Sequence, residues 1–272
     1  MDIGTIGGLI LGFAAMIVAF VMEGGSPSGL VQVTAGMIVL GGTFAATLVS
    51  TPLPVFMRLP RLVLAAARPQ ALDLQATIAL LVQLADKARR EGLLSLEEEA
   101  RRIEDRFLQR GVMLVVDGVD PEVVRDILEA DLASMEARHK MGHGLLEAMG
   151  GFSPTMGIIG TVMGLVSVLG HLDDPDGLGH KIAVAFIATL YGVAFANLVY
   201  LPLANKLKAQ TALEIQSREM MIEGILAVQA GENPRVVREK LETFLAPSER
   251  GSEAAPQARG TAVAGASARA QA

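Results

Sequence analysis

The sequence predicts an all-α membrane protein with four transmembrane helices and a helical cytoplasmic domain inserted between the second and the third. Of its 272 residues, 51% are hydrophobic and only 19% are charged, whereas charged residues make up about a quarter of a soluble domain. Asp, Glu, Lys and Arg are absent from four long stretches, at 3–22, 29–57, 148–170 and 182–205. Each stretch reaches the roughly 20 apolar residues that a helix needs to cross the hydrocarbon core.

The first stretch predicts a retained helix rather than a cleaved signal peptide, because only Asp2 precedes it as a charge and no A-x-A site follows it. With no cysteine, the chain has no disulfide, thiolate metal site or cysteine nucleophile. Its net charge of -6 argues against nucleic acid as a partner, since phosphate binding needs clustered Lys and Arg.

The distribution of basic residues predicts the orientation in the membrane. Arg58, Arg61 and Arg68 follow the second stretch, and Lys206 and Lys208 follow the fourth. The loops at the opposite ends, MEGGSPSG and HLDDPDGLGH, are short and carry more acidic than basic residues. By the positive-inside rule, both termini and the long middle segment are expected in the cytoplasm.

These boundaries divide the chain into five parts. Residues 1–57 are expected to hold transmembrane helices 1 and 2, 58–150 the cytoplasmic helical domain, 151–205 transmembrane helices 3 and 4, 206–246 the C-terminal cytoplasmic helices, and 247–272 a disordered tail. The tail is rich in Ala, Gly and Ser and has no apolar periodicity, which is typical of disorder.

Two start signals define helices in the cytoplasmic segment. Ser95 and Glu98 have the spacing of a capping box, so one helix is expected to end near Arg90 and the next to begin at Leu96. The second signal, at residues 120–121, is an Asp followed by a Pro in the first helical position. It predicts a long helix that runs past residue 149 directly into the third span.

Small residues recur on the faces of the spans. Gly4, Gly8 and Gly12 are four apart in the first span, and Gly160 and Gly164 repeat this spacing in the third. Such spacing lets helix backbones approach closely in lipid, although glycine is also common in membrane helices for no special reason. Four spans with several such faces favour an assembled bundle, expected to be an oligomer.

The charge-free spans contain hydroxyl groups instead of the intramembrane ionisable residues that ion pathways usually show. A membrane threonine commonly bonds back to the carbonyl four residues earlier, which needs no function. The alternative is a polar lining beside a carboxylate brought by another protein. The hydroxyl residues are Thr43, Thr47, Thr155, Thr161, Ser167 and Thr189.

Two prolines lie at the predicted cytoplasmic ends of the third and fourth spans. Pro154 is compatible with an ordinary helix start. Pro202 lies between two helical runs, where it removes a backbone hydrogen bond and clashes with residue 198. Pro202 therefore predicts a kink, hence a hinge.

His139 and His143 have the i,i+4 spacing that can hold a metal. The chain lacks the accompanying Glu of an H-E-x-x-H motif, and His171 and His180 are expected on the opposite side of the membrane. We therefore expect no metal and no cofactor. Without a phosphate loop, nucleophile elbow or dinucleotide fingerprint, an enzyme is not indicated.

Five segments together resemble the flagellar motor stator A-subunit of MotA/PomA type, in the wider MotA/TolQ/ExbB channel family. They are MDIGTIGGLILGF, ARREGLLSLEEE, DGVDPEVVRDILE, GFSPTMGIIGTVMGLV and AFIATLYGVAFANLVYLPLANKL. The resemblance covers nearly all of residues 1–245 in order and implies a bacterial inner-membrane protein. In that family the A-subunit forms a pentameric ring around a dimeric, peptidoglycan-binding B-subunit, whose membrane aspartate binds the coupling ion, H⁺ or Na⁺. The ring then acts on the rotor switch protein.

The resemblance implies a rotor-contact role for Arg89 and Glu97, with Arg90, Glu98 and Glu99 as neighbours that could share or replace it. A simpler interpretation competes with this role. Glu97 and Glu98 are each followed four residues later by an arginine, which is the spacing of ordinary surface ion pairs on a helix.

The resemblance also implies roles for residues of the spans. Thr161 and Thr189 match the hydroxyls that line the ion path and face the partner's aspartate, and Pro154 and Pro202 match the prolines that couple ion binding to movement. A related function is envelope energisation of TolQ or ExbB type. Those relatives are three-spanned, whereas this chain has four predicted spans and the GLLSLEEE hairpin.

Overall fold

The computed structural model describes residues 3–68, 73–170, 175–248 and 250, and every regular element within these ranges is helical. Four of its helices are long and apolar enough to cross a membrane. The predicted all-α fold with four spans is confirmed. Residues 251–272, which hold most of the predicted tail, and His171 lie outside the described residues.

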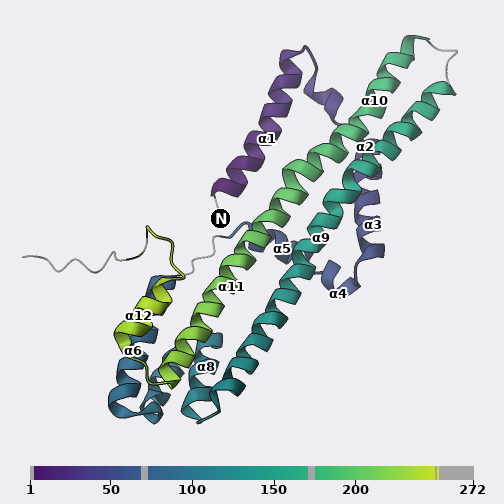
Figure 1. The fold of residues 1–272 in the computed structure, drawn as a ribbon. Coiled ribbons are helices and arrows are strands. Elements are labelled where there is room, and N and C mark those ends of the chain that lie inside the picture. The colour runs from purple at the N-terminus through teal and green to yellow at the C-terminus, as the bar shows by residue number, and fades with distance from the viewer. Residues whose placement is uncertain (1–2, 69–72, 171–174, 249, 251–272) are drawn as a thin grey trace, which may run out of the picture.

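Two long helical columns form the axis of the molecule (Figure 1). One is α9, Pro121–Leu169, a single helix of 49 residues. The other joins α10, Pro175–Ala194, the π-helical η4, Phe195–Tyr200, and α11, Leu201–Gln229. The predicted start of α9 is confirmed, because the Asp120 side chain accepts a hydrogen bond from the Glu122 amide and Pro121 follows it. The predicted continuation into the third span is also confirmed.

The first two spans lie beside these columns. The first is α1, Ile3–Met22. After the short η1, Pro27–Leu30, the second span consists of α2, Val33–Gly36, η2, Met37–Gly41, and α3, Gly42–Ser50. Two short helices, α4, Leu53–Phe56, and α5, Leu59–Ala66, lead out of it.

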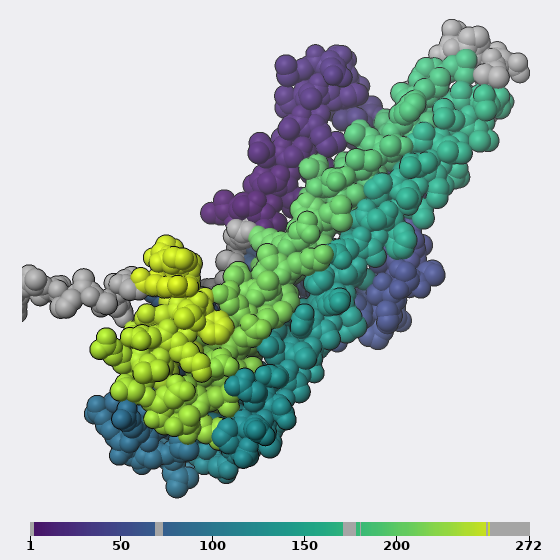
Figure 2. All heavy atoms as spheres, viewed as in Figure 1, coloured from purple at the N-terminus to yellow at the C-terminus, as the bar shows by residue number. Residues whose placement is uncertain are grey.

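α1 is the least packed of the four spans, since none of its residues is buried. It meets the rest of the chain mainly through the tilted ring pair Phe13–Phe195 and a contact between Gly12 and the Leu198 side chain. Figure 2 shows this purple segment standing at the side of the green column. Its apolar surface is therefore available to lipid or to other chains.

The cytoplasmic end is a compact helical domain. It contains α6, Leu74–Glu91, η3, Leu93–Leu96, α7, Glu97–Arg102, α8, Arg106–Val116, and α12, Pro234–Glu242, packed on the ends of α9 and α11. Its core buries large apolar side chains from each layer, including Leu81, Leu108, Leu128, Ile225 and Leu241. This is the only large core among the described residues, so the domain anchors the two columns relative to each other.

The predicted capping box at Ser95 and Glu98 is wrong. α6 ends at Glu91, Gly92 adopts a left-handed φ of 84°, and the Ser95 hydroxyl donates to the Gly92 carbonyl at 2.7 Å. α7 begins at Glu97 without a side-chain cap. The hydroxyl therefore closes the tight turn before the helix instead of capping the helix itself.

The cap of α8 generates a test of how this domain is held. The Asp105 carboxylate accepts from the amides of Phe107 and Leu108, both at 2.9 Å. Asp105→Ala should lower stability by about 1–2 kcal/mol, because it leaves both amides without this partner. Glu104→Ala is the matched control, since no side-chain cap involves Glu104. Thermal unfolding of the purified protein in detergent, followed by circular dichroism, should show a lower melting temperature for Asp105→Ala only. Equal melting of both variants would contradict the capping role.

Candidate functional site

The membrane part of the site is built where α9 and α10 approach each other through small residues. A Cβ on Gly157 would lie 2.8 Å from the Ala188 carbonyl oxygen, and one on Gly164 would lie 2.5 Å from the Ala185 Cβ. The Ser153 side chain is buried and donates to the Gly192 carbonyl at 3.0 Å. The predicted close-packing face at Gly160 and Gly164 is present, and it continues through Gly157 to Ser153.

This approach brings Thr161 of α9 and Thr189 of α10 into direct contact, with 2.5 Å between their hydroxyl oxygens. The Thr161 hydroxyl also lies 3.0 Å from the Ala185 carbonyl and 3.2 Å from the Gly157 carbonyl. The Thr189 hydroxyl lies 3.4 Å from the same Gly157 carbonyl. Both side chains are half-buried. We call this cluster of two hydroxyls and two carbonyls the hydroxyl notch.

The hydroxyl notch can take up a proton donor or a small cation. Each hydroxyl has one proton to donate and two lone pairs. The two hydroxyls can use their protons on each other or on the two carbonyls, so both hydroxyl oxygens retain acceptor capacity. Oxygen ligands suit hard cations. The spans of this chain contain no Asp or Glu, so a charged ligand for such an ion is not supplied by the spans themselves.

Two other threonines of the spans bond within their own helices. Thr47 donates to the Thr43 carbonyl at 2.7 Å, and Thr155 donates to the Phe152 carbonyl at 2.7 Å. Thr43 is fully buried, and its hydroxyl oxygen has no hydrogen-bond partner among the described residues. The local interpretation therefore holds for Thr47 and Thr155, whereas Thr161 also reaches across to the neighbouring helix.

Pro154 is not at a helix start, and that interpretation is wrong. It lies inside α9, more than eight turns after Pro121. A proline at this position leaves the Gly150 carbonyl without its usual amide donor. Gly150 is buried against the Leu201 side chain, because a Cβ there would lie 2.5 Å from Leu201 Cδ2. The interruption of the hydrogen-bond ladder therefore lies where α9 packs on the other column.

Pro202 lies in the first turn of α11, directly after the π-helical η4. The amide of Leu201 donates to the Ala196 carbonyl, five residues back. This wider turn is where the helix accommodates the missing amide of the proline. The helix thus continues through Pro202 with an irregular segment before it, and the kink predicted at Pro202 stays a prediction.

The four predicted rotor-contact residues lie at one exposed corner formed by the end of α6, η3 and the start of α7. Arg89 and Arg90 are in the last turn of α6, and Glu97 and Glu98 are in the first turn of α7. Arg90 pairs with Asp86 at 3.0 Å. No ion pair of Arg89 or Glu98 occurs within the described part of the chain. The corner therefore presents charge of both signs to solvent.

Surface ion pairs also form at this corner. Glu97 pairs with Arg101 at 2.8 Å, which confirms one of the two predicted i,i+4 pairs. Glu99 instead accepts from Lys87 of α6 at 2.6 Å. This hydrogen bond lowers the pKa of the Glu99 carboxyl and raises the pKa of Lys87. Because the pKa of the Glu99 carboxyl is lowered, the pair stabilises the folded corner at any pH above the ordinary carboxyl pKa. This stabilisation is lost as the pH falls through the lowered pKa.

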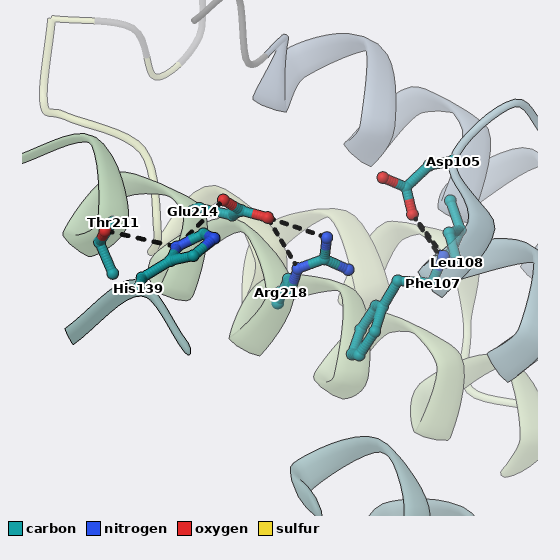
Figure 3. Close-up of polar contacts among 7 residues, drawn as sticks. All are labelled: Asp105, Phe107, Leu108, His139, Thr211, Glu214 and Arg218. Carbon is teal, nitrogen blue, oxygen red and sulfur yellow. Dashed lines mark hydrogen bonds and ion pairs between the residues drawn. The ribbon is translucent and has the colours of Figure 1, made fainter. Parts of the chain in front are cut away.

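A polar network joins the two columns to the cytoplasmic domain (Figure 3). His139 of α9 lies between Thr211, at 3.4 Å, and Glu214, at 3.8 Å, both of α11. Glu214 accepts from Arg218 at 2.9 Å, and the Arg218 guanidinium lies 4.6 Å from the centre of the Phe107 ring of α8. Ion-pair, hydrogen-bond and cation–π contacts thus run from α9 through α11 to α8. The i,i+4 spacing of Glu214 and Arg218 is a local signal for their ion pair, whereas their contacts with His139 and Phe107 join residues far apart along the chain and could not be predicted from the sequence.

His139 and His143 do not belong to any group of three or more potential metal ligands among the described residues. His139 takes part in the network above. The His143 Nδ1 atom is buried and has no hydrogen-bond partner among the described residues. Burial lowers the pKa of this imidazole, and the negative charge of Glu147, which raises the pKa, only partly offsets this effect. Both rings have a structural explanation in the packing of α9.

Comparisons with known proteins agree with this arrangement. Residues 99–220 match the family model described as the MotA/TolQ/ExbB proton channel family. The chain is 40% identical to chemotaxis protein PomA of Vibrio alginolyticus, over 93% of this chain and 99% of that protein. Its structure is similar to that of C. jejuni MotAB, with a TM-score of 0.87 and 30% identity over 92% of this chain and 98% of that one. It is also similar to the flagellar MotAB stator complex from Bacillus subtilis, with a TM-score of 0.85 and 37% identity over 90% of this chain and 96% of that one.

The closeness of α9 and α10 can be tested at Gly192. A Cβ there would lie 2.5 Å from the Ser153 carbonyl oxygen, which belongs to a helix backbone and cannot move alone. Gly192→Ala should therefore push the two helices apart and cost about 1–3 kcal/mol. Gly151→Ala is the control, since a Cβ at Gly151 meets nothing within 4 Å. The melting temperature of the purified protein in detergent should fall for Gly192→Ala and not for Gly151→Ala. A Gly192→Ala variant as stable as wild type would refute the close contact.

Proposed function

Because the chain belongs to the MotA/TolQ/ExbB proton channel family, we infer that it is a flagellar motor stator subunit, which forms an ion channel with a B-type partner. The observation that carries this conclusion is similarity over nearly the full length, in sequence and in fold, to motility A proteins and to MotAB stator complexes. The chain is a multi-pass protein of the inner membrane and a channel subunit rather than an enzyme.

We propose that the partner supplies the carboxylate of the ion path and that the hydroxyl notch receives it. Two observations support this. The four charge-free stretches contain no acid of their own, and Thr161 and Thr189 retain acceptor capacity beside two carbonyls. Binding of H⁺ or Na⁺ neutralises a carboxylate in a low-dielectric site, which removes a desolvation cost of several kcal/mol. Such a change is large enough to bias a two-state helix arrangement.

Pro154 and Pro202 are proposed to convert that bias into movement. Pro154 lies four residues after Gly150, whose packing partner Leu201 directly precedes Pro202. The two interruptions of the helix ladders therefore flank one contact between the columns. Helices bend most easily where backbone hydrogen bonds are missing or widened, so this contact is the proposed hinge.

The corner at Arg89, Arg90, Glu97 and Glu98 is the proposed rotor contact. It is exposed, carries both signs of charge, and projects from the cytoplasmic domain rather than from the spans. Charge complementarity of this kind favours fast association and correct orientation over tight binding. That suits a contact which must be made and released as the rotor passes.

Assembly and orientation complete the proposal. The unburied surface of α1 supports assembly with further copies, proposed as a pentamer around the partner. Both termini are proposed to be cytoplasmic, from the basic residues that follow the second and fourth spans. Residues 57, 150, 205 and 246 are the proposed last residues of the first membrane part, the cytoplasmic domain, the second membrane part and the C-terminal cytoplasmic helices.

Genetic rescue tests this function. Expressed with the B-type gene of its own source in bacteria that lack their stator, the wild-type chain should restore swimming. Arg89→Glu and Glu97→Lys should each reduce swimming speed severalfold without reducing membrane levels of the protein, because both charges are exposed and hold no core. Arg235→Glu, an exposed change on α12, is the control and should swim normally. Normal swimming of the double variant Arg89→Glu, Glu97→Lys would contradict the rotor-contact role. If the wild-type chain assembles with its B-type partner but does not restore swimming, envelope energisation would be favoured instead.

The hydroxyl notch is tested by Thr189→Val, which keeps the side-chain shape and removes the hydroxyl. Swimming of rescued cells should fall at least tenfold, since a transition-state loss of about 1.4 kcal/mol or more is expected from one missing hydrogen bond to a charged group. Thr155→Val is the matched control on the exposed side of α9, where the hydroxyl bonds only to its own helix. Speeds measured against sodium concentration and against a proton uncoupler identify the coupling ion. Equal speeds for the two variants would make Thr189 a packing residue.

A further inference from the structure

A cavity of about 530 Å³ lies between α5, α9 and α11, outside the hydroxyl notch and the charged corner. Its walls come from the amphipathic α5, from His139 of α9 and from one face of α11. The volume falls within the range of roughly 300–1,000 Å³ that is usual for small-molecule sites. The position of the cavity, and the basic and apolar residues on its two sides, indicate the class of molecule that it can bind.

The cavity lies at the cytoplasmic boundary of the membrane. The Leu62 side chain of α5 packs where a Cβ on Gly142 would be, and Ala66 packs with Leu146 and Leu203. The third charge-free stretch begins at residue 148 in α9, and the fourth ends at residue 205 in the second turn of α11. α5 therefore lies against the columns within about two turns of the level at which they leave the hydrocarbon core.

One side of the cavity is basic. Arg61 and Arg68 line it, both are exposed, and neither has an ion-pair partner within the described residues. Glu214 is the one acid among the lining residues that the structure describes, and Arg218 neutralises it through hydrogen bonds of 2.9 and 3.3 Å. The two guanidinium groups are therefore available to an anion.

The other side is apolar. Leu62, Leu64, Ala65 and Leu207 line it, and Leu64 is about half exposed, at 49%. A free phosphate would leave this apolar surface in contact with water. A molecule with an anionic head and a hydrocarbon chain satisfies both sides at once.

We propose that this cavity binds an anionic phospholipid of the inner leaflet, with the phosphate between Arg61 and Arg68 and the first part of an acyl chain along Leu64 and Leu207. Arginine forms bidentate hydrogen bonds with phosphate oxygens. Basic pockets beside membrane helices on the cytoplasmic side have the position and charge to hold such headgroups. This site is independent of the ion path and of the rotor contact.

The test uses the purified complex of this chain with its B-type partner, delipidated in detergent and incubated with phosphatidylglycerol or with phosphatidylcholine of the same acyl chains. Bound lipid is counted by native mass spectrometry. Wild type should retain phosphatidylglycerol about tenfold better than phosphatidylcholine, as expected for contacts of one headgroup with two basic residues. The double variant Arg61→Gln, Arg68→Gln should lose this preference, whereas Arg61→Lys, Arg68→Lys should keep most of it.

Two further variants make the result decisive. Arg235→Gln, Arg238→Gln removes the same charge from exposed ion pairs on α12 and should bind as wild type. Ala65→Trp fills the apolar side without changing charge and should abolish retention of phosphatidylglycerol. Equal retention of the two lipids by wild type would overturn the proposal. So would unaltered phosphatidylglycerol binding in Arg61→Gln, Arg68→Gln or in Ala65→Trp. Displacement of the lipid by millimolar glycerol phosphate would also overturn it, because it would indicate a soluble ligand.

Discussion

The architecture of the membrane part depends on the contact between α9 and α10 at residues without large side chains. In lipid there is no hydrophobic drive between helices, so association relies on backbone proximity, van der Waals packing and a few hydrogen bonds. Gly157 and Gly192 provide the proximity, and the Ser153 hydroxyl adds a bond to the Gly192 carbonyl. Because this contact fixes the register of the two helices, it also brings together two hydroxyls that are 28 positions apart in the sequence. The hydroxyl notch is therefore a consequence of packing.

A tightly packed pair of helices also has to move if it is to do work. The structure separates these two requirements along the columns. The part of the small-residue contact at Gly157, Gly160 and Gly164 is regular helix, whereas Pro154 on one column and the π-helical η4 with Pro202 on the other lie at its lower end. Within the two columns, both prolines and the π-helical segment lie at this level, and the core of the cytoplasmic domain beneath it is densely packed. Flexibility is thus located between two stiff regions.

Much of this fold follows from the sequence because its signals are local. Hydrophobic length defines four spans, and an Asp followed by a Pro defines the start of α9. The capping box predicted at Ser95 is wrong because a serine hydroxyl can bond either to the turn before it or to the helix after it. Gly92, with its left-handed φ, forms a tight turn here, and the Ser95 hydroxyl bonds to that turn. In the network of His139, Glu214 and Arg218, the i,i+4 pair of Glu214 and Arg218 is local, but the contact of Glu214 with His139 depends on tertiary packing, which no local pattern encodes. The family resemblance implies that Thr161 and Thr189 both line the ion path, but their direct contact was not predicted, since neither spacing nor composition relates residues on separate helices.

The unbroken course of α9 has a mechanical consequence. At about 1.5 Å per residue, its 49 residues make a rod of about 74 Å that passes from one compartment into the other without a loop. A loop at the membrane surface would absorb a small rotation or tilt, whereas a continuous rod delivers it to the far end. Since α8 and α11 pack on the part of α9 between Pro121 and Pro154, a tilt of this part about Pro154 would displace the tip of the cytoplasmic domain further than the residues next to the proline, as at the end of a lever.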